Sequence, residues 1–296
     1  CIRDSEHTGR SIVPTDPALA LIDAIIEDFG DEWVTKAMYH YRWAYQDGID
    51  KAGTLLPLSG NLQLDSDGAQ MSYDFFTQRQ IGRRELVGST DITQPIIESS
   101  YERLLDLMTA GFAERDFFLG DRPGRGDFGI FGQLTQLVKW DPTSVRIAEQ
   151  RAPKVINWVD RTDDLSWLPV EGNDGWVSLE SLPSATRRLL HEIGATYVPF
   201  LLANADALGA GKDEVVCEIL GDTYRQGPFA YQGKCLECSG GIMQHCPTPT
   251  ANESMPCLPA RAARRCSSEP TVRVRRRRSR RRRWPRELHR VRHRRP

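Results

Sequence analysis

Apolar residues recur along the first part of the chain at the spacing of one buried helical face. Between residues 15 and 43 they fall at three- and four-residue steps, at Leu19, Ile22, Ile26, Phe29 and Trp33. Thr15 or Asp16 can accept hydrogen bonds from the first free amide groups, and Pro17 suits a first helical turn. The pattern therefore predicts a long amphipathic helix that begins near residue 16.

Similar periodicity predicts further helices. They are expected near residues 73–86, from Pro95 onward, at 127–139, at 152–161 and at 184–208. Pro199 should kink or interrupt the last of them. Strand-like alternation is rare, and residues 174–182 are the best short candidate. The sequence therefore predicts an all-α body without internal repeats.

Composition narrows the class of protein. With 296 residues, of which 40% are hydrophobic, the chain can form one large or two ordinary domains. No stretch approaches the roughly 18 apolar residues of a membrane span, and no signal segment opens the chain. Only two of the seven cysteines, Cys1 and Cys217, lie outside residues 235–266. A disulfide scaffold is therefore excluded, no membrane is expected as a partner, and a reducing cytoplasm is the expected compartment.

Charge divides the chain into an acidic body and a basic end. The 39 basic and 40 acidic residues nearly cancel, yet 17 Arg and only two acidic residues follow residue 260. The run RVRRRRSRRRRWPRELHRVRHRRP would bind polyanions nonspecifically through its charge. No Lys follows Lys234, a bias that charge does not require and that a GC-rich gene read in the wrong frame would produce. Residues 238–296 are therefore predicted to be a disordered Arg-rich tail of aberrant origin.

A cysteine-rich stretch at the border of this tail raises the question of zinc. Its candidate ligands are Cys235, Cys238, His245, Cys246 and Cys257. The second half lacks the paired spacing of a zinc knuckle or ribbon, and few large apolar residues flank it. No metal site is therefore predicted.

The segment FFLGDRPGRGDFGIFGQL leads from a tight turn into a helix. Asp127 stands at the third helical position, where its carboxylate can reach back to the amides at the helix start, as in a capping box. This segment resembles the capped core helix in the C-terminal domain of the glutathione S-transferase superfamily, whose usual pattern is G-D-x-P-[ST]-x-A-D. Gly120, Asp121 and Pro123 match as well, whereas Gly124 replaces the hydroxyl cap and Gly126 the Ala. Each glycine inside a helix costs about 1 kcal/mol relative to Ala.

The resemblance extends over about residues 10–237, through RSIVPTDPALALIDAIIEDFG, ATYVPFLLANADAL and GPFAYQGKCLE. It implies a helical bundle over residues 16–237, preceded at 1–15 by the exit segment of a thioredoxin-like N-terminal domain. In the family that missing domain holds the glutathione site and the residue that activates the thiol. The chain as given is therefore expected to be an inactive fragment, and no catalytic residue is assigned.

The resemblance also suggests where an electrophilic substrate would bind. The first helix of this domain lines the electrophile pocket in the family, so Tyr39, Arg42 and Trp43 are the pocket candidates. Aromatic rings could hold a flat electrophile, and Arg42 could attract its charge or a glutathione carboxylate. Packing in the core or at a domain interface is the alternative role of each residue, and the one that residue statistics favour.

Other candidates receive less support from the residues. Asp4-Ser5 matches the acidic residue and Ser with which the family holds glutathione, but Gly9 follows closely and a linker is the favoured interpretation. Cys1 lacks a helix start that would lower its pKa. His40 and His191 have no acid or Ser partner that the sequence can place, so a hydrolase triad is not supported.

The expected function is the addition of the glutathione thiol to electrophiles by the intact family member. Glutathione is then a co-substrate, no further cofactor is expected, and the family allows a homodimer. Two alternatives remain: a noncatalytic helical domain for binding or dimerisation, and polyanion or nucleic-acid binding through the Arg-rich tail.

Overall fold

The computed structural model describes residues 11–172 and 174–236. Their elements are, in order, α2 (Pro17–Phe29), η1 (Gly30–Val34), α3 (Thr35–Ala44), α4 (Gln46–Gly60), α5 (Ser66–Ile81), η2 (Glu85–Val87), α6 (Gln94–Gly111), α7 (Arg125–Leu137), α8 (Pro142–Arg151), α9 (Pro153–Asp163), α10 (Ser184–Ala195), α11 (Tyr197–Ala210), β1 (Val215–Ile219) and β2 (Asp222–Gln226). The all-α prediction is confirmed for this part of the chain. None of its helices is long and apolar enough to cross a membrane.

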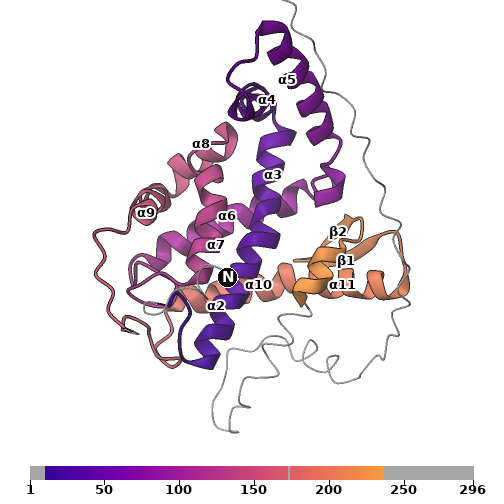
Figure 1. Ribbon diagram of the computed structural model, residues 1–296. Helices are drawn as coiled ribbons and strands as arrows, with labels where there is room; N and C mark the ends of the chain where they lie inside the picture. Colours follow the sequence, from indigo (N-terminus) through magenta and orange to yellow (C-terminus); the bar gives the residue numbers. More distant parts are fainter. Residues whose placement is uncertain (1–10, 173, 237–296) are drawn as a thin grey trace, which may run out of the picture.

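The predicted first helix forms a rod that consists of α2, η1 and α3. Figure 1 shows α2 and α3 running along one face, with α6 and α7 behind them and the α4–α5 hairpin at the far end. Asp16 rather than Thr15 caps the rod, because its Oδ1 atom accepts from the amides of Ala18 and Leu19 at 2.9 Å. A π-helical segment, η1, joins α2 to α3. There Gly30 meets α7 so closely that an added Cβ would lie 2.8 Å from the Gly129 carbonyl carbon.

The hydrophobic core lies between this rod, α6, α7 and the later helices. Ile26, Leu105, Ile130 and Leu134 are completely buried within it. Burying one such side chain stabilises the fold by about 1.5–3 kcal/mol. The periodic residues of the sequence therefore meet in one cluster, and this burial orients α2, α6 and α7.

Two buried carboxylates cap the start of α7. Asp127 accepts from the amides of Gly124, at 2.9 Å, and Phe118, at 3.1 Å. Asp23 reaches across from α2 and accepts from the amides of Arg125, at 3.2 Å, and Gly126, at 2.9 Å. Burial raises the pKa of Asp127 to about 7, and its two amide donors oppose this rise.

The glycines that depart from the family pattern make room for Asp23 and α2. A Cβ on Gly124 would lie 2.4 Å from the Asp23 Oδ1 atom, and one on Gly126 would lie 2.8 Å from the Ile26 Cβ atom. The two glycines therefore have a packing role that their low helix propensity alone does not indicate. Gly124 has no hydroxyl, and a carboxylate from another helix takes its place.

The first and last helices of the sequence prediction agree with the structure, but several elements differ. α4 and α8 were not predicted, and α5 begins at Ser66, before the predicted start near residue 73. The break between α10 and α11 falls at Thr196, so that Pro199 lies in the first turn of α11. Backbone N–H groups in a first turn have no acceptor within the helix, so the missing N–H of Pro199 costs no hydrogen bond.

The short strand predicted at residues 174–182 is not present, and the strands lie elsewhere in the chain. Within 174–182 only Trp176 forms an isolated bridge, to Gly120. The strands are β1 and β2, an antiparallel hairpin in which Val215 pairs with Gln226. Leu220 and Gly221 both have positive φ, as the tight hairpin turn requires. Leu in place of the usual Asn or Asp conceals this turn signal. Residues 1–10 and 237–296, with Cys1, Ser5 and the Arg-rich tail, lie outside the described residues.

Replacing Asp127 with Ala should destabilise the fold by about 1–2 kcal/mol or more, because two buried amides lose their acceptor. Urea unfolding measures the change, and Asp127→Asn, which keeps one acceptor oxygen, should lose less. An unchanged midpoint for Asp127→Ala would contradict the capping role.

Two glycines of α7 should respond in opposite ways to Ala. Gly126→Ala should destabilise by about 1–3 kcal/mol, because the added methyl group collides with Ile26. Gly132 is exposed, and a Cβ there would meet nothing within 4 Å, so Gly132→Ala should stabilise by up to about 1 kcal/mol. Equal shifts of the thermal midpoint would mean that helix propensity alone governs both positions.

Candidate functional site

The three pocket candidates lie on α3, and the structure gives each a different environment. Tyr39 is half-buried, and its hydroxyl donates to the backbone carbonyl of Gln80 at 2.8 Å. Burial raises its pKa, against the nearby charges of Arg83 and Arg79. The ring of Trp43 lies 6.4 Å from that of Tyr39, measured between ring centroids. Tyr39 and Trp43 therefore form one aromatic pair.

Trp43 is buried, at 2% exposure, and packs against α5. Its ring lies 5.7 Å from that of Phe76, edge to face. The aromatic pair of Tyr39 and Trp43 thus attaches the α5 helix to α3. Of the two, only Tyr39 retains appreciable exposed surface.

Arg42 is held by a buried carboxylate. Its Nε and Nη2 atoms donate to the two oxygens of Asp141 at 2.9 and 3.0 Å, and Nη2 also donates to Gln136 at 2.8 Å. The guanidinium carbon lies 4.6 Å from the centroid of the Trp140 ring. Burial raises the pKa of Asp141, and Arg42 opposes that rise. An anionic ligand at Arg42 would therefore have to compete with Asp141.

His40 has the Ser and acid partners that the sequence could not place. Its Nδ1 atom lies 2.8 Å from Ser89 Oγ, and its Nε2 atom lies 3.0 Å from Glu98 Oε1. Tyr45 and Gln94 also donate to Glu98. Burial lowers the pKa of His40, and the Glu98 hydrogen bond opposes this shift.

This cluster has the composition of a hydrolytic triad but not its accessibility. Ser89 is only 1% exposed, and the Nε atom of Arg84 donates to its hydroxyl oxygen at 3.3 Å. A nucleophile must reach its substrate, and Ser89 cannot. The cluster instead fastens α3 to α6 and to the loop before it. His191, the other histidine considered, lies on α10 and is exposed.

Lys36 is the functional candidate that the sequence analysis missed. It is 2% exposed, and its Nζ atom donates to Gln226 Oε1 at 2.7 Å and to the Val87 carbonyl at 3.1 Å. Burial lowers its pKa to about 7, which the charge of Glu32 opposes. Its acceptors lie far along the chain, so only the fold reveals this site.

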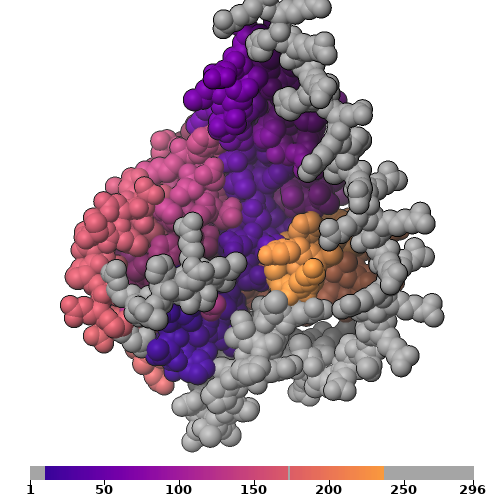
Figure 2. Space-filling model, in the orientation of Figure 1, coloured from indigo at the N-terminus to yellow at the C-terminus, as the bar shows by residue number. Residues whose placement is uncertain are grey.

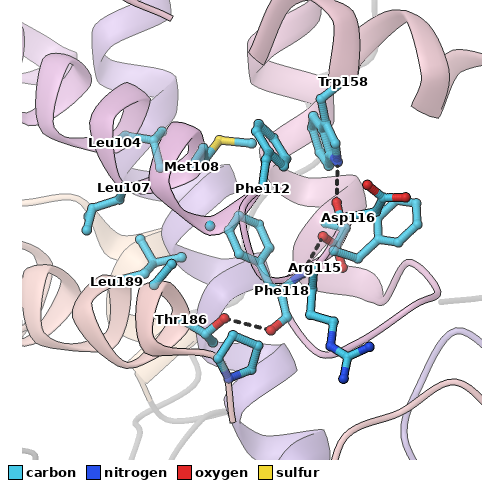
Figure 3. A pocket seen from close by; sticks show the side chains of 15 residues that line it. Leu104, Leu107, Met108, Phe112, Arg115, Asp116, Phe118, Trp158, Thr186 and Leu189 are labelled. Carbon is cyan, nitrogen blue, oxygen red and sulfur yellow. Dashed lines mark hydrogen bonds between the residues drawn. The ribbon is translucent and has the colours of Figure 1, made fainter. Parts of the chain in front are cut away.

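A small apolar cavity lies on the other side of the core, among α6, α9 and α10 (Figure 3). Met108 of α6, Phe112 directly after that helix, Trp158 of α9 and Leu189 of α10 border it. Thr186 closes one side by donating to the Phe118 carbonyl at 2.6 Å. The cavity measures about 20 Å³, which is room for about one water molecule. It is too small for a drug-sized electrophile.

Within residues 11–172 and 174–236, no group of three His, Cys, Asp or Glu side chains could hold a metal ion. Neither Cys217 nor Cys235 forms a disulfide within these ranges. Four of the five zinc candidates, Cys238, His245, Cys246 and Cys257, lie outside these ranges, as does the Asp4-Ser5 candidate for glutathione.

Comparison with known proteins gives one match. Residues 82–161, which contain α6, α7, α8 and most of α9, match the family model described as the glutathione S-transferase C-terminal domain. Neither the curated proteins nor the solved structures contain a match. The matched range includes the α7 cap but not α3.

Replacing Arg42 with Met should destabilise the fold by about 3–5 kcal/mol, because the buried Asp141 loses the cation that is hydrogen-bonded to it. In the double variant Arg42→Met/Asp141→Asn much of this loss should be recovered. Chemical unfolding of the single and double variants measures the coupling, and a loss below about 1 kcal/mol in Arg42→Met would contradict this structural role.

Proposed function

Since residues 82–161 carry a glutathione S-transferase C-terminal helical domain, we propose that the protein takes part in the conjugation of glutathione to small electrophiles. The match to this domain is the observation that carries the proposal. The helical domain is the part that contacts the electrophile, and α3 is the helix that does so. Glutathione and an electrophile with an apolar, flat portion are the proposed small-molecule partners.

The chemistry assigns separate tasks to the two partners. The glutathione sulfur, as a thiolate, attacks the electrophilic carbon of the substrate, and a leaving group or a neighbouring double bond accepts the displaced electron pair. Holding both reactants together supplies much of the rate. In this scheme the described residues orient the electrophile, and none of them is assigned the activation of the thiol.

Surface position supports α3 as the contact helix. Figure 2 shows the surface of α3 as a strip between the α8–α9 side of the molecule and the β hairpin. Tyr39 is the favoured contact residue, because its ring is half-buried and its hydroxyl is anchored on Gln80. A ring fixed in this way offers a flat apolar surface at little entropic cost. Trp43 supports the ring from behind, and Arg42 keeps α3 in place through Asp141.

The small volume of the cavity between α6 and α10 also favours this assignment. A space of about 20 Å³ cannot hold the electrophile. In this proposal the substrate binds on the surface of the domain, where a second surface can complete the pocket. A cytoplasmic location is proposed with this function, because a cysteine outside a disulfide, such as Cys217, suits a reducing compartment.

Conjugation assays of the natural gene product that contains this chain test the proposal. Glutathione and an aryl halide should react faster than without protein. Tyr39→Ala should then change the ratio of kcat/KM between an aryl halide and an unsaturated carbonyl electrophile by about tenfold, while the KM for glutathione changes less than about twofold.

Tyr231→Ala is the matched control, because Tyr231 is exposed on the segment after the hairpin and should leave this ratio unchanged. Absence of conjugation above the uncatalysed rate, together with no retention on immobilised glutathione, would rule the transferase function out. That outcome would favour the noncatalytic binding or dimerisation role, for which the exposed side chains of Met71 and Phe75 on α5 offer apolar surface.

A further inference from the structure

The β1–β2 hairpin closes over η1 and the first turn of α3. Val215, Ile219 and Tyr224 face inward and are completely buried. The Tyr224 ring lies 5.7 Å from that of Trp33 on η1 and 5.5 Å from that of Phe200 on α11. Figure 1 shows the hairpin beside α11 and α3. The hairpin thus covers an aromatic cluster that belongs to two other elements.

Lys36 of α3 lies beneath this cover. Its Nζ atom lies 4.4 Å from the centroid of the Phe200 ring, 5.8 Å from Tyr224 and 5.9 Å from Trp33. Among the described residues, Gln226 of β2 and the Val87 carbonyl of η2 supply the hydrogen-bond acceptors. The amine therefore connects α3 to the hairpin and to the loop before α6 at a single point.

The acceptors are built tightly around this point. Gln226 Oε1 accepts from the Tyr224 hydroxyl at 3.0 Å as well as from Lys36 at 2.7 Å. Gly88 has a φ of +80°, and a Cβ at this residue would lie 2.1 Å from the Tyr224 hydroxyl and 2.5 Å from Gln226 Oε1. The backbone after η2 therefore lies so close to the hairpin that only glycine fits at position 88.

Among the residues that the structure describes, the amine has acceptors but no buried counter-charge. No carboxylate of the described residues forms an ion pair with it within 4.0 Å. The titratable groups that face it are Glu32 on η1, Cys217 on β1 and Tyr224 on β2. Burial raises the pKa of Cys217 to about 11 and raises that of Tyr224 further, so both stay neutral near neutral pH. A neutral amine has two N–H donors, which the two acceptors satisfy, whereas an ammonium ion brings a third donor and a buried charge.

We infer that Lys36 is a proton-sensitive latch for the β1–β2 hairpin: the neutral amine fastens the hairpin to α3, and its protonation loosens it. The three rings reduce the cost of a cation at this position but do not replace water or a carboxylate. Opening the hairpin exposes Lys36 to water and uncovers Trp33 and Phe200. The latch thereby couples proton concentration to the exposure of an apolar surface, a property separate from the proposed conjugation.

The direction of the pH dependence follows from proton binding. In the closed form Lys36 has a pKa of about 7, whereas in the open form it returns toward its ordinary value of 10.5. Between these values the open form binds more protons, so a falling pH favours opening. Below about pH 7 both forms carry the proton, and the latch is then fully weakened.

Amide hydrogen exchange of residues 215–226 tests the latch in the complete chain. After division by the intrinsic exchange rates, the protection factors of the hairpin should rise from about pH 7 to pH 9 by up to about tenfold per pH unit. At pH 7 they should lie below those of Leu104 and Leu105 in α6, which exchange only when the whole fold opens. This difference identifies a local opening.

Three variants separate the amine from other causes. Lys36→Met keeps the length of the side chain without its charge and should make hairpin protection independent of pH in this range. Lys36→Arg should remain loosened throughout the range, because its charge persists. Cys217→Ser should keep the pH dependence of the natural chain. The latch would be refuted by persistence of the pH dependence in Lys36→Met, by a flat profile in the natural chain, or by hairpin protection equal to that of α6 at every pH.

Discussion

The contact between α2 and α7 depends on two buried carboxylates, those of Asp23 and Asp127. Asp23 and Asp127 are each 1% exposed. Together their carboxylates accept hydrogen bonds from the backbone amides of Phe118, Gly124, Arg125 and Gly126. Burial raises the pKa of both, and the amide donors counteract this rise. A buried helix start without acceptors would be costly, because each unpaired amide loses about 1–3 kcal/mol. The two carboxylates remove that cost and fix the position of α7 in the core.

The same constraint explains Gly126 in α7 and Gly30 in η1. An acceptor that comes from a neighbouring helix requires the two backbones to approach, and side chains at Gly126 or Gly30 would prevent this. Arg125 completes the contact from the edge, with its Nε atom 3.2 Å from Asp23 Oδ2. Poor helix propensity at these positions is therefore the local consequence of a favourable contact between two helices.

A similar principle organises α3, whose polar residues connect it to distant elements. Lys36 bonds to the β hairpin, Tyr39 to α5, His40 to α6 through Glu98, and Arg42 to the turn before α8 through Asp141. Each polar group is satisfied by a partner 41 or more residues away along the chain. A helix whose charged and aromatic residues look like a binding site in the sequence is thus the principal connector of the fold.

The sequence predicted those parts of the structure that depend on local order. The buried faces of α2, α6 and α7 follow from periodicity, and the reach of Asp127 to Gly124 follows from a separation of three residues. It could not predict Asp141 as the partner of Arg42, because 99 residues separate them, nor Ser89 and Glu98 as the partners of His40. The packing role of Gly126 was hidden for the same reason: its helix propensity is local, but the Ile26 side chain that requires a glycine belongs to another helix. The hairpin was missed because Leu220 occupies a turn position where Asn or Gly usually signals the bend.

These contacts also bear on where the proposed conjugation would take place. The match to the glutathione S-transferase C-terminal domain covers α6, α7 and α8, whereas the candidate contact residues lie on α3. Arg42 is already neutralised by Asp141, and Trp43 is buried, so of the three pocket candidates only Tyr39 combines an aromatic surface with partial exposure. A cavity of about 20 Å³ cannot enclose a substrate within the bundle. In the proposed function the helical domain would therefore present one rigid wall to an electrophile. The connections of α3 would provide that rigidity, because a wall held at four points loses little entropy when a ligand binds against it.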